Sequence, residues 1–522
     1  MHSLLCSQDI LSQVFGQLVN ELDNIRDGEE ERNEIQKSLL RGTMLHAALT
    51  CRTMQEPALD ALWRILDSLH PIFRLVNGFG SVHGNFTLIK GVTEEELQRV
   101  RKYSGRVRKL FYVGYYEPIH PVAYLRLAQA LGSPILPLLR DLTWSSRDVG
   151  LQLPSLVTST LVNVNIRLFI SEDDDDDDED RFKLAHSVTQ TQALQIVVED
   201  LADKVPHIQE LVLENFRPGV SLYTVRNFTR LRSLRIATDV YWQSYNAFVS
   251  ISYSDLLALS QMGSLSELSA NVDDTDVLTT SRALSFRSLR VLKLTGHLSK
   301  VIAVLKLVQS IPLQRIDVCL GGGDAPQHDW YQNFFRCISL PSLRHLFVEF
   351  TYDLQKQNVR AGVVLDVRTI IPPLLVCAQL THFEIELSSH AEQRVLMDDD
   401  DLLQMAQAWP HLEYFCWNFA YDISRIPTVR GLHAFAAHCP RLRTLMIALN
   451  GNVPFPEANK APDSQHDLKR LVAYGPDLGE ITDTAQWVYA LFPSVEDIME
   501  RGKWPQVLKI VQAFRRMRAV HG

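Results

Sequence analysis

The sequence predicts an α/β fold in which a short all-α segment precedes a curved solenoid, with parallel strands on the concave face and helices outside. Two observations support this prediction. Three amphipathic helical segments occupy positions 1–75, and one short apolar motif recurs through the rest of the 522-residue chain. A chain of this length exceeds what one compact core holds, so repeats or several units are expected.

The composition is that of an ordinary globular protein. Hydrophobic residues make up 46% of the chain, charged residues make up 22%, and the net charge is -9. This negative balance argues against a nucleic-acid partner, which would require a dominant basic face. The seven cysteines are widely spread and form no C-x-x-C pair, which is typical of a reducing compartment. Because no signal-peptide core or apolar span of ~20 residues is found, we expect a cytoplasmic or nuclear protein with no membrane contact.

The N-terminal segment 1–75 predicts three short helices. Apolar residues at positions 10, 11, 14, 15 and 18 form one helical stripe, and Ser7 is well placed to cap it. The charged stretch 20–37 predicts an acidic loop. Apolar periodicity resumes from Leu39 to Leu49, and Pro57 is placed to open a third helix at its first turn. Helices this small need the rest of the chain or a partner to bury their apolar sides.

Three runs within this segment resemble the F-box of many fungal F-box proteins. They occur in the order of that family: Gln8-Asp9-Ile10-Leu11, Leu49-Thr50-Cys51-Arg52 and Glu56-Pro57-Ala58-Leu59-Asp60-Ala61-Leu62-Trp63. The resemblance covers roughly positions 1–75. The sequence departs from the family pattern at Cys6-Ser7, where Leu-Pro is usual, and in the acidic insert that lengthens the first connection.

The resemblance implies a docking role, because in that family the F-box binds a Skp-type adaptor of a cullin-based ubiquitin ligase. Carried over to this chain, the candidate adaptor contacts are Ile10, Leu11, Leu49, Pro57, Leu59 and Leu62. The alternative is that these side chains only pack the helices together or against the repeats, which a motif match does not decide. Trp63 is expected in the core.

The recurrent motif is apolar-x-x-apolar-x-apolar. Copies begin at residues 208, 231, 265, 289, 313, 343, 380, 412, 442 and 468, at intervals of 23 to 37 residues, and weaker ones begin at 107, 139, 161 and 495. These intervals overlap or slightly exceed the ~20–29 residues of a leucine-rich repeat. Each copy predicts one strand, and the stretches 253–262, 401–409 and 431–438 predict helices between them. Asp398 to Asp401 is expected to cap the second of these helices.

The pattern resembles the irregular leucine-rich repeats that commonly follow an F-box, although the Asn or Cys after the third apolar position is mostly absent. An ordinary α/β domain with parallel strands is the alternative. The predicted organisation is an F-box-like segment at 1–75, a connecting segment at 76–105, a leucine-rich-repeat solenoid at 106–500 and a C-terminal capping helix at 501–522. The acidic run within 171–181 predicts a solvated loop inside the solenoid.

The sequence contains no motif for catalysis, a metal or a cofactor. It has no H-E-x-x-H pair, no nucleophile elbow and no phosphate loop with its Lys-Ser/Thr. Its seventeen histidines show no ligand spacing with cysteine. We therefore expect a protein that is not an enzyme and holds neither metal nor cofactor.

In a repeat solenoid, the residues that flank the middle apolar position of each strand face the concave side. The predicted target contacts among them are Arg235, Lys293, Arg315, Phe347, His382 and Tyr414. Mixed charge with aromatic residues suits a protein surface. The resemblance therefore implies the substrate-recognition subunit of a cullin-type (SCF) ubiquitin ligase, with a Skp-type adaptor, a cullin and an unknown target protein as partners. The alternative is a ligase-independent leucine-rich-repeat interaction scaffold.

Overall fold

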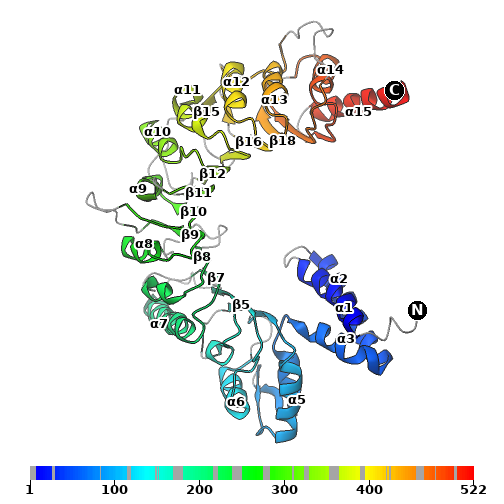
Figure 1. Cartoon of the computed structure of the whole chain (residues 1–522), viewed down its shortest axis with the longest axis vertical. Helices are drawn as coiled ribbons and strands as arrows, with labels where there is room; N and C mark the ends of the chain where they lie inside the picture. Colours follow the sequence, from blue (N-terminus) through cyan, green and yellow to red (C-terminus); the bar gives the residue numbers. More distant parts are fainter. Residues whose placement is uncertain are drawn as a thin grey trace. The chain divides into compact units, whose positions relative to one another are not determined.

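The structure of the chain is a computed structural model (Figure 1). It describes residues 8–25, 30–82, 84–114, 119–146, 150, 152–168, 180–215, 221–237, 250–273, 275, 283–308, 311–321, 328–351, 364–387, 394–418, 420–421, 425–453, 464–475, 478–498 and 503–521. The chain forms two compact units, Met1–Val249 and Ser250–Gly522.

Fifteen parallel strands lie within the described residues, and all except β1 are formed by a copy of the apolar motif. The first unit holds β1 (Ile65–Leu66), β4 (Lys109–Val113), β5 (Asp141–Ser146), β6 (Asn163–Leu168), β7 (Glu210–Glu214) and β8 (Ser233–Ala237). The second unit holds β9 (Glu267–Asn271), β10 (Val291–Gly296), β11 (Arg315–Gly321), β12 (His345–Thr351), β14 (His382–Leu387), β16 (Tyr414–Asn418), β18 (Thr444–Ala448), β19 (Arg470–Tyr474) and β20 (Asp497–Ile498).

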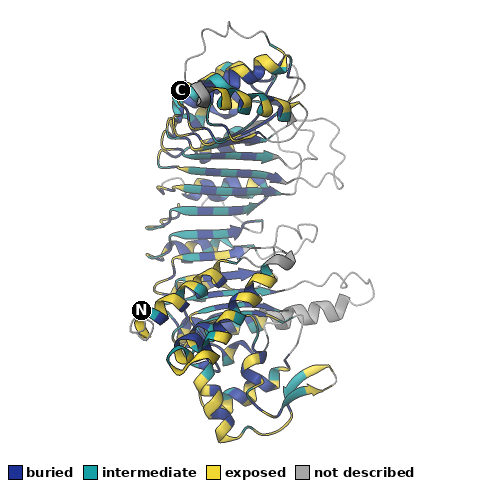
Figure 2. Ribbon diagram, turned by 90° about the vertical axis from the view of Figure 1, so that its right-hand side faces the viewer, coloured by how far each residue is buried: buried dark blue, intermediate teal, exposed yellow. Residues whose placement is uncertain are grey.

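The motif accounts for both the strand and its burial. Its first apolar residue lies two positions before the strand and is fully buried, as Leu313 shows at 0% exposure. The middle and third apolar residues, Ile316 and Val318 in β11, are also buried and point to the same side of the strand. The residues between them point the other way, and β11 alternates between buried and half-buried positions (Figure 2).

Helices cover one side of the second unit's strands, and Figure 1 shows α8 to α13 along that side. They are α8 (Tyr253–Ser260), α9 (Leu298–Val308), α10 (His328–Cys337), α11 (Val367–Ile370), α12 (Asp399–Ala408) and α13 (Leu432–His438), followed in the chain by α14 (Ile481–Leu491) and α15 (Trp504–His521). Short 3-10 turns, η6 (Pro372–Val376) and η7 (Val429–Gly431), take part in the same layer. The three helices predicted between copies of the motif are confirmed as α8, α12 and α13.

The first unit has a different set of helices. Three of them form an N-terminal group: α1 (Gln8–Asn24), α2 (Glu30–Thr50) and α3 (Arg52–Arg64). The others are α4 (His70–Phe73), α5 (Glu94–Ser104), α6 (Pro121–Leu131) and α7 (Asp180–Lys204), with the 3-10 turns η2 (Leu153–Ser155) and η4 (Leu222–Asn227). An antiparallel hairpin, β2 (Phe79–Val82) with β3 (Asn85–Leu88), lies in the stretch predicted as a connecting segment.

Several local predictions for the N-terminal segment 1–75 were wrong. The stretch 20–37, predicted as an acidic loop, is largely helical, because α1 continues to Asn24 and α2 begins at Glu30. Glu, Arg and Lys favour helices and keep their charges solvated on an exposed side, so charge alone does not indicate a loop. The third helix begins at Arg52, and Pro57 lies inside it rather than at its start.

β1 was not predicted either, because the apolar pattern from Pro57 indicates a third helix that continues to Leu66. In the structure they pair with Lys109 and Leu110 of β4, so a tertiary partner decides their conformation. Most of the predicted acidic loop at 171–181 lies outside the described residues, but its last two residues, Asp180 and Arg181, belong to α7.

A small parallel sheet in the second unit is held by an ion-pair network. Its strands are β13 (Val364–Asp366), β15 (Arg394–Leu396) and β17 (Ala420–Tyr421). Arg425 pairs with three aspartates: with Asp401 at 2.6 Å, Asp398 at 2.9 Å and Asp366 at 3.0 Å. Asp398 is also the N-cap of α12, in a reciprocal capping box with Asp401, as the sequence predicts.

None of the helices that the structure describes is long and apolar enough to cross a membrane. The six cysteines among the described residues are free thiols, and four of them are buried.

Candidate interaction surfaces

The N-terminal helices share one apolar core. Leu11 and Phe15 of α1 meet Met44 of α2 and Ala58 of α3, and Ile65 of β1 joins the same cluster. Met44 and Ala58 have 0% exposure, so the three helices form a packed unit. This packing is what their separate apolar stripes require, because each helix alone buries too little surface.

The predicted adaptor contacts divide into buried, half-buried and exposed residues. Leu11 is 2% exposed and Pro57 is buried, while Leu59 and Leu62 pack partly buried against the same core. Ile10 is half-buried. Only Leu49, at 75% exposure, is available to a partner without any change in the helices. For Leu11 and Pro57, the structure therefore favours the alternative, that they pack the helices together.

Helix α2 carries a second apolar side that faces solvent. Leu40, Met44 and Ala48 point into the core, but four large apolar residues on another side of the same helix are exposed: Ile35 (67%), Leu39 (69%), Leu45 (44%) and Leu49 (75%). Their spacing of 4, 6 and 4 residues places them on one side of a helix. We call these four residues the α2 face. A helix with two apolar sides buries one and leaves the other for a partner.

The sequence contained the signal for the α2 face. The apolar periodicity predicted from Leu39 to Leu49 includes Leu39, Leu45 and Leu49 as well as Leu40 and Met44. The two sets lie on different sides of a helical wheel, so the combined stripe is too wide for one buried side.

Charged contacts fix α1 and α3 on the rest of the first unit. Arg106 binds both Glu56 and Asp60 of α3, and Lys109 of β4 lies 2.6 Å from Asp23 of α1. The ring of Trp63 packs on Tyr103, with 4.7 Å between ring centroids. Trp63 was expected in the core. In the structure it is half-buried against α5.

The second unit presents a sheet side whose side chains point away from the helices. We call it the open face and define it by three rows of residues in strict register. The first row runs through Glu267, Val291, Arg315, His345, His382, Tyr414, Thr444, Arg470 and Asp497. The second runs through Lys293, Asp317, Phe347, Glu384, Cys416 and Met446, and the third through Cys319, Glu349 and Glu386. All of the second-unit residues predicted to contact a target belong to these rows.

Three rings of the first row stack across neighbouring strands. The ring centroids of His345 and His382 are 4.0 Å apart with planes at 12°, and those of His382 and Tyr414 are 4.1 Å apart with planes at 5°. Glu384 fixes two of the rings, because one of its oxygens lies 3.1 Å from His382 Nε2 and the other accepts a hydrogen bond from Tyr414 at 3.0 Å. The stack is therefore a preorganised aromatic surface, since its rings are held before any partner arrives.

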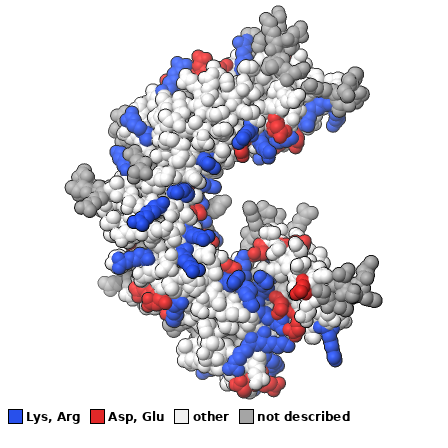
Figure 3. All heavy atoms as spheres, viewed as in Figure 1, with Lys and Arg blue, Asp and Glu red and all other residues white. Residues whose placement is uncertain are grey.

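Some acidic residues of the open face form ion pairs with Lys or Arg, and others do not. Lys293 lies 2.7 Å from Glu267, Arg315 lies 2.9 Å from Asp317, and Arg470 lies 3.1 Å from Asp497. Figure 3 shows basic and acidic side chains interspersed in this way over the described part of each unit.

Three glutamates, in contrast, have no Lys or Arg within ion-pair distance among the described residues. We call Glu349, Glu384 and Glu386 the acidic patch. Glu349 of β12 and Glu386 of β14 are in register, and Glu384 lies two residues before Glu386 on the same strand. All three are half-buried.

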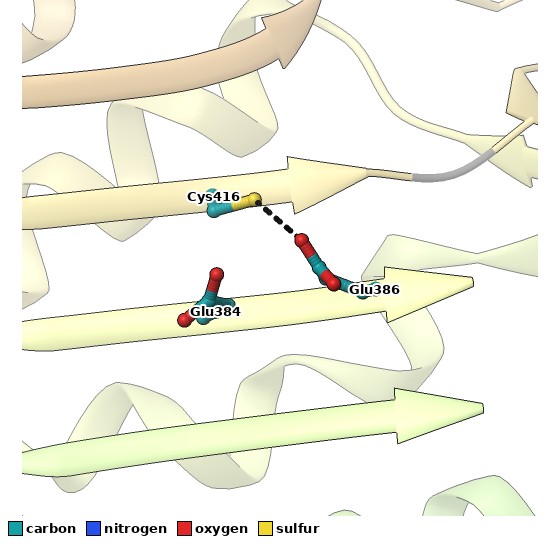
Figure 4. Close-up of side chains that lie close together, drawn as sticks. All are labelled: Glu384, Glu386 and Cys416. Carbon is teal, nitrogen blue, oxygen red and sulfur yellow. Dashed lines mark hydrogen bonds between the residues drawn. The ribbon is translucent and has the colours of Figure 1, made fainter. Parts of the chain in front are cut away.

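Two of these carboxylates lie next to a buried thiol. Figure 4 shows Glu384 and Glu386 on β14 beside Cys416 on β16, with the thiol directed at Glu386. Cys416 donates a weak hydrogen bond to Glu386 at 3.9 Å, and the possible ligand atoms of the three residues lie within 4.8 Å of one another. Burial raises the pKa of the Cys416 thiol strongly, and the charges of Glu384 and Glu386 raise it further. The thiol is therefore protonated at neutral pH, whereas a metal would need the thiolate.

Burial also raises the pKa of Glu386, and the charges of Glu384 and Glu349 add to the effect. A cation next to Glu386 would reverse this trend, because an opposite charge favours the ionised carboxylate. The patch is thus a place where positive charge is electrostatically favoured.

The structure brings five of the six predicted target contacts onto one face: Lys293, Arg315, Phe347, His382 and Tyr414. Arg235 lies on β8 in the first unit, where it pairs with Glu214 at 3.4 Å. The sequence analysis missed Glu349 and Glu386. Extending the period-2 rule one residue past the third apolar position would have found both.

Comparisons with known proteins add little to this description. No protein-family model matches the chain, and no curated protein matches it. A solved structure to which it is similar is the crystal structure of a TLR13–ssRNA13 complex, with a TM-score of 0.31 and 11% sequence identity. The match covers 77% of this chain and spans 57% of that chain's length.

Proposed function

We propose that the chain is the substrate-recognition subunit of a cullin-type (SCF) ubiquitin ligase. In this proposal α1, α2 and α3 are an F-box that docks on a Skp-type adaptor, and the open face of the second unit binds a target protein. The exposed α2 face is the observation that carries the proposal, because it lies in the same three helices as the F-box-like runs. The strand-and-helix repeats, of the leucine-rich-repeat type, are the scaffold for the target.

The α2 face has the energetic character of an interface. Burying one exposed Leu or Ile side chain completely stabilises a complex by about 1.5–3 kcal/mol. The four residues of the α2 face therefore offer several kcal/mol to a partner with a matching apolar groove, offset by the cost of association. A stripe of this length on one helix suits a helix-and-groove contact.

The protein would make no covalent chemistry in this role. It would hold a target near the transfer machinery, so that its contribution is proximity and orientation. A shallow sheet face with rings and mixed charges supports binding of a protein surface, since a small molecule needs a closed pocket.

Co-purification with a Skp-type adaptor and its cullin tests the docking half of the proposal. The variant Leu39→Asp with Leu49→Asp places charge on the α2 face, where both side chains are exposed and lie outside the helical core. We expect the full chain to recover the adaptor and the variant to lose it. A double variant at Leu11 and Leu62 is less informative, because Leu11→Asp would open the helical core.

Leu125→Asp is the matched control, because Leu125 is 48% exposed on α6, away from the α2 face. It should recover adaptor like the parent chain. If the parent chain recovers no adaptor, or the α2-face variant recovers as much as the parent, the protein is a ligase-independent interaction scaffold instead.

A further inference from the structure

We propose that the acidic patch of Glu349, Glu384 and Glu386 receives a Lys or Arg side chain of the bound protein. The inference rests on the proposed function only in that the open face binds a protein. It adds the chemistry of the partner, which is a segment carrying a basic residue.

The first support is the contrast with the other carboxylates of the open face. Glu267, Asp317 and Asp497 each have a basic partner at 3.1 Å or less on the same or a neighbouring strand. The acidic patch lies between these balanced pairs, on β12 and β14. Three half-buried carboxylates without a described cation therefore form a local excess of negative charge, which is complementary to a basic partner.

The second support comes from the hydrogen-bond partners of each carboxylate of the acidic patch. Both oxygens of Glu384 are engaged, by His382 and by Tyr414, so this residue fixes the aromatic stack. Glu349 and Glu386 are contacted by thiols, Cys319 at 3.7 Å and Cys416 at 3.9 Å. Thiols are weak donors, so these two carboxylates keep most of their capacity to accept hydrogen bonds from a guanidinium or an ammonium group.

The third support is the neighbouring apolar surface. Phe347 lies two residues before Glu349 and is in register with Glu384. Its half-buried ring offers an apolar contact to the aliphatic stem of a Lys or Arg whose charged end reaches the carboxylates. The patch therefore offers separate contacts to the two halves of a basic side chain.

A selection from a random peptide display library tests the inference without knowledge of the natural target. The full chain and its Glu349→Gln with Glu386→Gln variant are used as baits. Glu267→Gln is the matched control, because it removes one carboxylate of the same face that already has Lys293 as its partner. We expect the parent chain and the control to enrich peptides containing Lys or Arg. The double variant should bind those peptides at least about tenfold more weakly, because charge-assisted hydrogen bonds are lost.

Each other outcome overturns the inference. It is wrong if the parent chain selects no peptides, if the selected peptides lack basic residues, or if the double variant binds them equally well. It is also wrong if Zn²⁺ binds the parent with a requirement for both Cys416 and Glu386, since the patch would then be a metal site.

Failure here is distinguishable from failure of the proposed docking. The α2-face variant leaves the acidic patch unchanged and should bind the selected peptides like the parent chain. Adaptor recovery, in turn, should be unchanged in the Glu349→Gln with Glu386→Gln variant.

Discussion

Single side chains of the open face differ in how their charge is compensated. Lys293 and Glu267 neutralise each other across β9 and β10, while Glu349 and Glu386 meet across β12 and β14 with like charge. Like charges opposite one another in a sheet are destabilising. The pairing of Glu349 with Glu386 therefore opposes folding, and its explanation is sought in binding.

Glu386→Gln should therefore stabilise the protein. We expect the free energy of unfolding at pH 7 to rise by about 0.2–1 kcal/mol, because the like-charge contact with Glu349 disappears. Since burial and the neighbouring carboxylates raise the pKa of Glu386, the wild-type protein relieves the same strain by taking up a proton as the pH falls. The advantage of the variant should shrink toward acid pH, as measured by urea denaturation.

Glu267→Gln serves as the comparison, because it breaks the exposed pair with Lys293 and should lower the free energy of unfolding by at most about 1 kcal/mol. Equal stability of Glu386→Gln and wild type at pH 7 would show that the acidic patch is already neutralised.

His345 should remain neutral well into the acid range. Burial, together with the charges of His382, Arg315 and Lys293, lowers its pKa to about 3. Asp317 lies 3.6 Å away, but Arg315 already engages that carboxylate and burial raises its pKa. Because the folded pKa of His345 lies below its unfolded value near 6.5, its contribution to stability is complete above about pH 6.5 and is lost as the pH falls toward about 3.

NMR titration of the imidazole should show no protonation of His345 between pH 7 and about pH 4.5. The variant His345→Asn should flatten the decline of stability with acid in the same range. An imidazole that titrates near its ordinary pKa would contradict the description of a half-buried, stacked ring.

At the scale of elements, the strands could be predicted and several helix boundaries could not. The motif predicts three buried positions for a strand, as Leu313, Ile316 and Val318 show. Its recurrence along the chain indicates a strand at each copy. The start of α3 depends instead on how Cys51 and Arg52 follow α2, which no local pattern specifies. Ile65 and Leu66 become strand only because β4 pairs with them.

The Arg425 network should be an important support for the repeats around α12. Asp401 is almost fully buried, with a side-chain exposure of 2%, so Arg425→Met leaves its charge paired, among the described residues, with the largely exposed Arg368 alone. We expect a loss of about 3 kcal/mol in the free energy of unfolding, measured by chemical denaturation. Arg368→Met is the control, because Arg368 pairs with two of these aspartates, Asp398 and Asp401, from a side chain that is 52% exposed. It should cost less than about 1 kcal/mol.

A loss as small as that of the control would mean that Asp401 is sufficiently stabilised by its hydrogen bonds in the α12 capping box. The ion pairs of Arg425 would then add little to the attachment of the small sheet of β13, β15 and β17 to α12.

At the scale of the whole molecule, the proposed function uses two separate surfaces on two units. The α2 face belongs to the first unit and the acidic patch to the second. The helical segment of the α2 face and five residues of the open face, Lys293, Arg315, Phe347, His382 and Tyr414, could be predicted from the sequence. The exposure of Leu49 and the burial of Leu11 could not be predicted, because burial within a helical group is a tertiary property. The period-2 rule reaches Glu349 and Glu386, but their position opposite each other depends on cross-strand register, which the sequence does not specify.

The measurement that tests the central claim most directly is a paired binding assay on four forms of the full chain. These are the parent, the Leu39→Asp with Leu49→Asp variant, the Glu349→Gln with Glu386→Gln variant, and Leu125→Asp. Each is tested against a purified Skp-type adaptor and against a basic peptide selected by the parent chain. We expect the α2-face variant to lose only the adaptor, the acidic-patch variant to lose only the peptide, and Leu125→Asp to lose neither. Adaptor binding that is absent in the parent, or unaffected by the α2-face substitutions, would contradict it.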